Sequence, residues 1–169
     1  SPFFIHLGKR LRGPKGIKIG QIKNITIKNI TAAGPYEPYD IIEWNYVSFV
    51  NKDRKQYPWI FGSAEGVKNL NESKDSPWQF ISNICGLPGH DLENITLENI
   101  KFELAGGCNE YNEIVPEEAQ EYPEVYVYGK VLPAKGIYFR HIINLHLKNI
   151  EISTIRPDIR KDMVFNDIK

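Results

Sequence analysis

The chain has 169 residues, of which 41% are hydrophobic and 25% are charged, which is the balance of a folded globular domain rather than of a disordered chain. Lysine and arginine together number 21, as do aspartate and glutamate, so the formal net charge is zero and nothing points to nucleic acid or to a membrane surface. No apolar run approaches the length of a membrane span. We therefore treat residues 1–169 as one domain.

Two strand-like stretches open the chain. The first is PFFIHLGKRL over residues 2–11, in which a period of two turns Phe3, Ile5 and Leu7 toward a core. The second, IKNITIKNITA over residues 22–32, has the same period of two between Asn24 and Asn29. This alternation predicts one face in the core and the other in water.

Further short strands are expected along the chain. DIIEWNYVSFV over residues 40–50 and SPWQFISNICGLPG over 76–89 are short and apolar. LENITLENIKFEL over 92–104 is followed, after a long gap, by GIYFRHIINLHLKNIEI over 136–152, and MVFNDI over 163–168 ends the series. No long segment with a helical period separates them, so the pattern predicts an all-β fold.

One phrase recurs three times and aligns without a gap on Asn24, Asn94 and Asn144. Asparagine tolerates the left-handed backbone that a sharp bend needs, and the amides of stacked bends can pair with one another. Such stacking is typical of a parallel β-helix, a single-stranded solenoid in which neighbouring coils bury one core. A leucine-rich repeat is the rival interpretation, but here the asparagine comes one residue too early and no helical return segment follows.

The three copies are separated by 70 and 50 residues. Structural repeats usually run about 20 to 50 residues, so we expect degenerate coils and loops to lie between the copies.

Residues 105–136 interrupt the repeats as a long inserted loop. A loop of this length is usually functional or mobile. Tyr122 and Tyr126 offer flat surfaces that stack on sugar rings, or that pack the loop onto its scaffold. Glu117 and Glu118 are adjacent and point apart on an extended chain, so they are poorly placed as the paired carboxylates of a glycosidase.

Basic side chains end two of the predicted strands: Arg10 and Arg12 after the first, and Arg140 with His141 before the third copy. An arginine fork binds carboxylates at two points, which suits an acidic polysaccharide, although a solvated turn with a surface ion pair explains it as well. The histidines have no spacing that a metal site requires, so no metal is expected. The two cysteines are more simply explained as buried thiols than as a disulfide.

Four longer phrases follow one another along the chain: PFFIHLGKR, ISNICGLPGHDLENITLENIKFELAGG, VPEEAQEYPEVYVYGKVLPAKGIYFRHIINLHLKNIEI and RPDIR. In that order they resemble the C-terminal part of bacterial members of glycoside hydrolase family 28, the polygalacturonase-like pectin hydrolases. The resemblance covers nearly the whole chain. It implies a right-handed parallel β-helix that is exported to the periplasm or cell surface. It also implies hydrolysis of galacturonic or rhamnogalacturonan chains with inversion, without metal or organic cofactor.

The catalytic signature of that family is missing. Asn-Thr-Asp, Asp-Asp, Gly-His-Gly and Arg-Ile-Lys do not occur, and Gly89-His90 is followed by Asp91. We therefore expect the catalytic coils upstream of these C-terminal coils, and we assign no catalytic residue within this chain. An uncovered first coil exposes apolar side chains, so we also expect missing N-terminal coils or self-association at that end.

The leading hypothesis is the C-terminal section of a pectin-directed glycoside hydrolase, with an acidic polysaccharide as its partner. The candidate substrate contacts are Arg10, Arg12, Tyr122, Tyr126, Arg140 and His141. The alternatives are a non-catalytic carbohydrate-binding or adhesin-type β-helix, which binds without turnover, and a structural solenoid without affinity for sugar.

Overall fold

The computed structural model describes residues 2–9, 11, 13–34, 81–109, 111, 113–115, 117 and 132–169. The strand expected over residues 40–50 and most of the inserted loop lie outside these residues, as do four of the six predicted substrate contacts, Arg10, Arg12, Tyr122 and Tyr126. None of the described residues forms a helix of the length and apolarity that crossing a membrane requires.

The described residues form six strands that are joined by parallel pairing only. They are β1 (Phe4–His6), β2 (Lys23–Ala33), β3 (Ser82–Cys85), β4 (Leu92–Gly106), β5 (Ala134–Arg156) and β6 (Lys161–Ile168). The pairing order is β1-β3-β5-β4-β2, and β6 pairs with β5. For the described residues, the expected all-β architecture with parallel pairing is confirmed.

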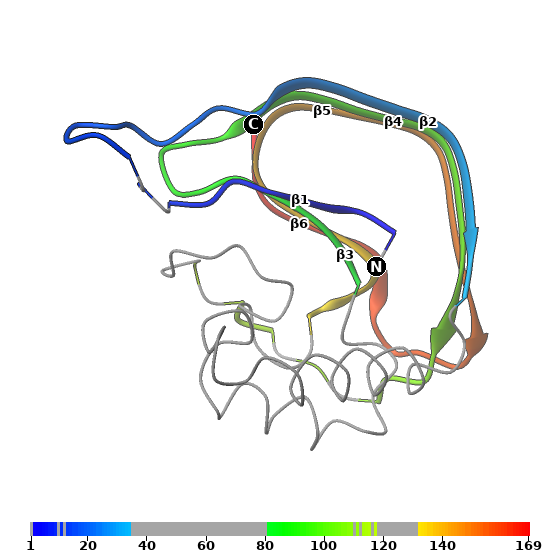
Figure 1. The fold of residues 1–169 in the computed structure, drawn as a ribbon. Coiled ribbons are helices and arrows are strands. Elements are labelled where there is room, and N and C mark those ends of the chain that lie inside the picture. The colour runs from blue at the N-terminus through cyan, green and yellow to red at the C-terminus, as the bar shows by residue number, and fades with distance from the viewer. Residues whose placement is uncertain are drawn as a thin grey trace, which may run out of the picture.

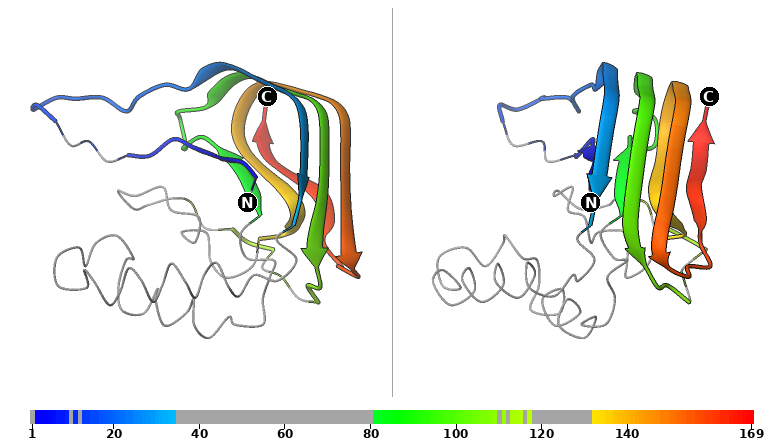
Figure 2. Two further views of the ribbon diagram at one scale, coloured as in Figure 1. Left: turned by 45° about the vertical axis from the view of Figure 1, so that its right-hand side comes forward. Right: turned by 90° about the vertical axis from the view of Figure 1, so that its right-hand side faces the viewer.

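The sheet curls because β5 bends. Its first part pairs with β3 and β6, its second part pairs with β4, and His141 lies between them with a left-handed φ of 52°. Seen along the stack, β2, β4 and the second part of β5 follow one curved wall, and β1, β3 and β6 run back beneath it (Figure 1). Figure 2 shows the strands of the curved wall side by side.

We name the two walls by the side chains that distinguish them. The asparagine sheet consists of β2, β4 and residues 142–156 of β5. The arginine sheet consists of β1, β3, residues 134–140 of β5, and β6.

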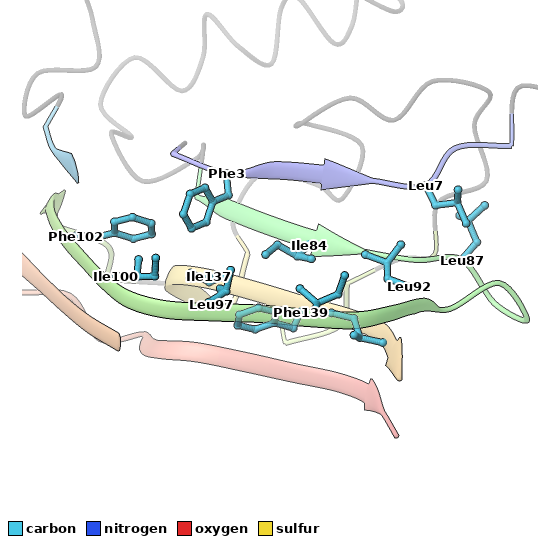
Figure 3. Packing of buried hydrophobic residues seen from close by; sticks show 12 residues of the cluster. Phe3, Leu7, Ile84, Leu87, Leu92, Leu97, Ile100, Phe102, Ile137 and Phe139 are labelled. Carbon is cyan, nitrogen blue, oxygen red and sulfur yellow. The ribbon is translucent and has the colours of Figure 1, made fainter. Parts of the chain in front are cut away.

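The core fills the space between the two sheets (Figure 3). Leu97 from the asparagine sheet and Ile84 and Phe139 from the arginine sheet are all 0% exposed. Phe3, just before β1, meets Phe102 of β4 edge to face, with ring centroids 5.3 Å apart. Each sheet buries one apolar face against the other, as the period of two predicts.

The asparagines form two ladders along the asparagine sheet. Asn94 Nδ2 donates to Asn24 Oδ1 at 2.7 Å, and Asn144 Nδ2 donates to Asn94 Oδ1 at 3.0 Å. The second ladder repeats this geometry at Asn29, Asn99 and Asn149. All six residues have a left-handed φ between 52° and 59°. The predicted bends and amide pairing are confirmed.

The expectation of intervening coils was wrong, because the three copies are direct neighbours. Ile25 pairs in register with Ile95, and Ile95 pairs with Leu145. The repeat length of a solenoid limits only the part of each coil that packs on its neighbours. An insertion after a strand lengthens the sequence between copies without separating them in the stack.

Candidate functional site

The arginine sheet presents a row of chemically active side chains on the face opposite the core. Parallel pairing in register places His6, Cys85, Arg140 and Asn166 in one line across four strands. A second line contains Asn83, Tyr138 and Val164. A solvent-facing row would leave these side chains hydrated, but Asn83, Cys85, Tyr138 and Arg140 are at most 1% exposed.

Arg140 lies on this face, and three of the described residues contact its guanidinium. Its Nε donates to Tyr138 Oη at 3.0 Å, and its Nη2 donates to the Val115 carbonyl oxygen at 2.6 Å. Its Nη1 lies 3.3 Å from Glu117 Oε2. Burial without such partners would cost several kcal/mol, so these contacts explain how a guanidinium is retained here.

His141 follows Arg140 at the corner between the two sheets. Its Nδ1 lies 2.6 Å from Asp167 Oδ2 and its Nε2 lies 3.0 Å from Glu117 Oε2. Both ring nitrogens therefore lie within hydrogen-bond distance of a carboxylate oxygen. The hydrogen bond from His141 is the main cause that lowers the pKa of Asp167, and Lys169 adds to it.

The corner is set by backbone geometry in neighbouring coils. Asp167 has a left-handed φ of 50°, close to the 52° of His141, so the two side chains project side by side from equivalent positions. Gly86 lies in the preceding coil, where its N–H donates to the Arg140 carbonyl oxygen at 2.9 Å. A Cβ at position 86 would lie 2.6 Å from the His141 carbonyl oxygen, so only glycine allows this approach.

Burial controls the other titratable groups of this face. Desolvation, with a further contribution from the Arg140 charge, lowers the pKa of His6 to about 4, so His6 is neutral at pH 7. Burial raises the pKa of the Cys85 thiol and that of the Tyr138 phenol. Cys85 is therefore an unreactive thiol. Cys85 and Cys108 are buried and form no disulfide with each other, which confirms the simpler interpretation.

Asp91, His141 and Asp167 come close enough to consider a metal ion, with one ligand atom of each inside 4.8 Å of the others. However, Lys169 Nζ lies 3.0 Å from Asp91 Oδ2 and 3.4 Å from Asp167 Oδ2. The ammonium group occupies the position between the carboxylates and compensates their charge. This arrangement is a surface ion-pair network that tethers the end of β6.

The structure brings two predicted contacts, Arg140 and His141, into one site and adds two residues that the sequence reasoning did not select, Glu117 and Asp167. In the sequence, Glu117 stands out only because Glu118 follows it, and adjacent carboxylates are poorly placed as a catalytic pair. Asp167 carries a readable signal, because FRHI at 139–142 and FNDI at 165–168 align, which places His141 and Asp167 at equivalent corners. The substrate roles of Arg140 and His141 stay predictions.

No protein-family model, no curated protein and no solved structure matches this chain. Two buried hydrogen-bond donors, one guanidinium and one imidazole, converge on a single carboxylate oxygen outside the apolar core. Such a pair favours a carboxylate over a neutral group, because charge-assisted hydrogen bonds are about twice as strong as neutral ones.

Proposed function

We propose that this chain is the C-terminal section of a glycoside hydrolase that acts on a pectin-type acidic polysaccharide with inversion. In this proposal the chain supplies scaffold and one wall of the substrate cleft. The carboxylates that act as acid and base come from outside the chain. Neither a metal nor an organic cofactor takes part, and the protein works in the periplasm, at the cell surface or outside the cell.

The pair of donors, Arg140 and His141, is the observation that carries this proposal. Arg140 projects from the curled parallel sheet away from the apolar core, His141 follows it at the corner, and both contact one carboxylate oxygen. A polymer of uronic acids presents one carboxylate on every sugar, so a wall that holds carboxylates suits that polymer better than a neutral one.

The proposed architecture is a right-handed parallel β-helix. The curled parallel sheet and the two asparagine ladders support it, because both arise when coils of one shape stack in register. The phrases that resemble family 28 support the handedness and the substrate class.

The remaining sugar contacts in this proposal are Arg10, Arg12, Tyr122 and Tyr126. The arginines would pair with uronate carboxylates, and the tyrosines would stack on sugar rings. Since Arg140 and His141 are buried, we expect these four residues to supply most of the contact with the polymer.

Hydrolysis assays of the natural polypeptide that contains this chain test the proposal. We expect reducing ends to be released from polygalacturonate or rhamnogalacturonan, and none from neutral galactan. The double variant Arg10→Ala/Arg12→Ala should raise KM on the acidic polymer, whereas Lys148→Ala, which removes a charge from the asparagine sheet, should not. Absence of product from every uronic-acid polymer would exclude a pectin hydrolase.

A carbohydrate-binding β-helix without catalysis is the second candidate, and one observation favours it: the chain contains no Asp-Asp pair. It predicts that the same polypeptide retains acidic polymer in affinity electrophoresis and releases no reducing ends. The two assays together separate the candidates.

A further inference from the structure

Glu117 makes an unusual contact with β5. Its side chain is 49% exposed, whereas the side chains of Arg140 and His141, which it meets, are 2% and 8% exposed. Both contacts fall on one oxygen, Oε2, at 3.3 Å from Arg140 Nη1 and at 3.0 Å from His141 Nε2. The donors are thus buried and the acceptor is open to solvent.

The two donors are fixed without help from Glu117. Arg140 is oriented by Tyr138 Oη and by the Val115 carbonyl oxygen. His141 is oriented by Asp167 at 2.6 Å. A donor pair that is already in position loses little conformational entropy when a carboxylate binds, so more of the interaction energy remains as affinity.

A second buried arginine of the same chain shows what a permanent pair looks like. Arg160 Nε and Nη2 donate to the two oxygens of Asp158 at 3.0 and 2.9 Å, and both side chains are at most 1% exposed. The Arg160–Asp158 contact is bidentate, short and buried. Arg140 contacts Glu117 through one oxygen only, at a longer distance, and the Glu117 carboxylate is exposed to solvent. This is the geometry of an exchangeable partner.

We propose that Arg140 and His141 form a carboxylate-binding site that Glu117 fills from within the chain and yields to the carboxylate of a ligand. The ligand class is a carboxylate, either a uronic acid of the polysaccharide or a small organic anion. The first of these rests on the proposed function. When a ligand replaces Glu117, the hydrogen bond from Arg140 to the Val115 carbonyl oxygen remains and holds the backbone at Val115 in place.

Histidine NMR on the 169-residue chain tests this site. The ring nitrogen signals of His141 are assigned by their loss in His141→Gln and are followed while sodium formate is added. Glu117→Ala should show a saturable shift of the His141 signals, with an apparent Kd at least about tenfold below that of the wild type. Glu113→Ala is the matched control, because it removes the same exposed charge from the same segment, and it should titrate like the wild type.

A second pair of probes identifies the source of the carboxylate. Galacturonate should shift the His141 signals of Glu117→Ala, and galactose, which lacks the carboxylate, should not. If formate binds and galacturonate does not, the carboxylate site stands and its ligand is a small anion, which argues against pectin. The formate result is independent of any hydrolysis assay, so failure of the proposed function leaves it intact.

The proposal is overturned if folded Glu117→Ala shows no formate-dependent change at His141. Glu117 would then be only a structural partner of Arg140. If Glu117→Ala loses the dispersed spectrum of a folded chain, Glu117→Gln is titrated instead, since it keeps the volume of the side chain and removes its charge. The same saturable shift is expected with Glu117→Gln, and its absence counts equally against the site.

Discussion

The asparagine sheet and the arginine sheet share one strand, one register and one core, yet their outer faces differ. The asparagine sheet carries hydrated ion pairs, such as Glu98 between Lys28 at 2.7 Å and Lys148 at 2.8 Å. On the arginine sheet the outward Tyr138 and Arg140 are each 1% exposed. The same period of two therefore produces a wet face on one wall and a buried polar face on the other.

This difference shows what buries polar side chains on the outer face of a parallel sheet. Alternation decides which side chains turn away from the core, but a second layer decides whether they lose their water. On the arginine sheet the segment that contains Val115 and Glu117 supplies part of that layer. Electrostatic interactions strengthen where water is excluded, so a carboxylate is recognised far better on the covered wall than on the wet one.

The largest expected effect comes from removing one outward charge from each wall of β5. Arg140→Met leaves the Val115 carbonyl oxygen buried without its donor and should lower the free energy of unfolding by about 2–3 kcal/mol. Lys148→Met removes an exposed ammonium and should leave the urea midpoint unchanged within error. Equilibrium urea denaturation of both variants measures the contrast.

Repeating the urea denaturation at high salt tests whether the effect of Arg140→Met comes from a buried contact. The loss in Arg140→Met should persist at high ionic strength, because buried pairs are screened much less than exposed ones. Equal midpoints for the two variants would mean that the outer face of the arginine sheet is hydrated, and the contrast between the walls would fail.

The next effect tests the asparagine sheet at Asn94, the middle of one ladder. Asn94→Ala loses both ladder hydrogen bonds and places a Cβ at a φ of 57°, so we expect a loss of about 2 kcal/mol. Asn94→Gly loses the same hydrogen bonds but accepts the left-handed backbone, and should cost about 1 kcal/mol. Thermal unfolding of the two variants separates the amide from the backbone.

Their order decides the interpretation. If alanine is tolerated as well as glycine, the bend at Asn94 is not left-handed. If neither variant loses stability, the ladder hydrogen bonds contribute nothing and the register is fixed by the core alone.

The asparagine sheet could be predicted from the sequence because its signals are local. Each asparagine lies at a bend, and it pairs with the equivalent asparagine of the next copy. Aligning the three copies on Asn24, Asn94 and Asn144 is therefore enough to predict the ladder. The adjacency of the copies was missed, because residue counts between them include insertions that do not enter the stack.

The arginine sheet was predicted only in part, because its site depends on contacts between distant segments. In GIYFRHI a period of two places Arg140 on the face opposite Ile137 and Phe139, and those two residues lie in the core. The site of Arg140 includes contacts with Val115 and Glu117, which lie 25 and 24 residues before their partners Arg140 and His141 in sequence. No period connects such residues, so a single sequence gives no signal for their contact. The proximity of His141 and Asp167 could have been predicted, because FRHI at 139–142 aligns with FNDI at 165–168 and places the two residues at equivalent positions.

The smallest expected effect is a pH dependence on the wet wall. Hydrogen bonds from Lys148 and then Lys28 lower the pKa of Glu98 from 4.5 to about 2. A carboxyl group whose pKa is lower in the folded state stabilises that state above its unfolded pKa, and the contribution disappears as the pH falls toward the folded value. Glu98→Gln should therefore have a slightly lower urea midpoint than the wild type at pH 7, and the gap should close between about pH 4.5 and about pH 2. Added salt should close the same gap at pH 7, because the three side chains meet water, whereas the loss in Arg140→Met should survive it. If the difference in urea midpoint between the wild type and Glu98→Gln persists in both acid and high salt, the ion pairs of Glu98 are shielded from solvent. The outer faces of the two sheets would then not differ in hydration.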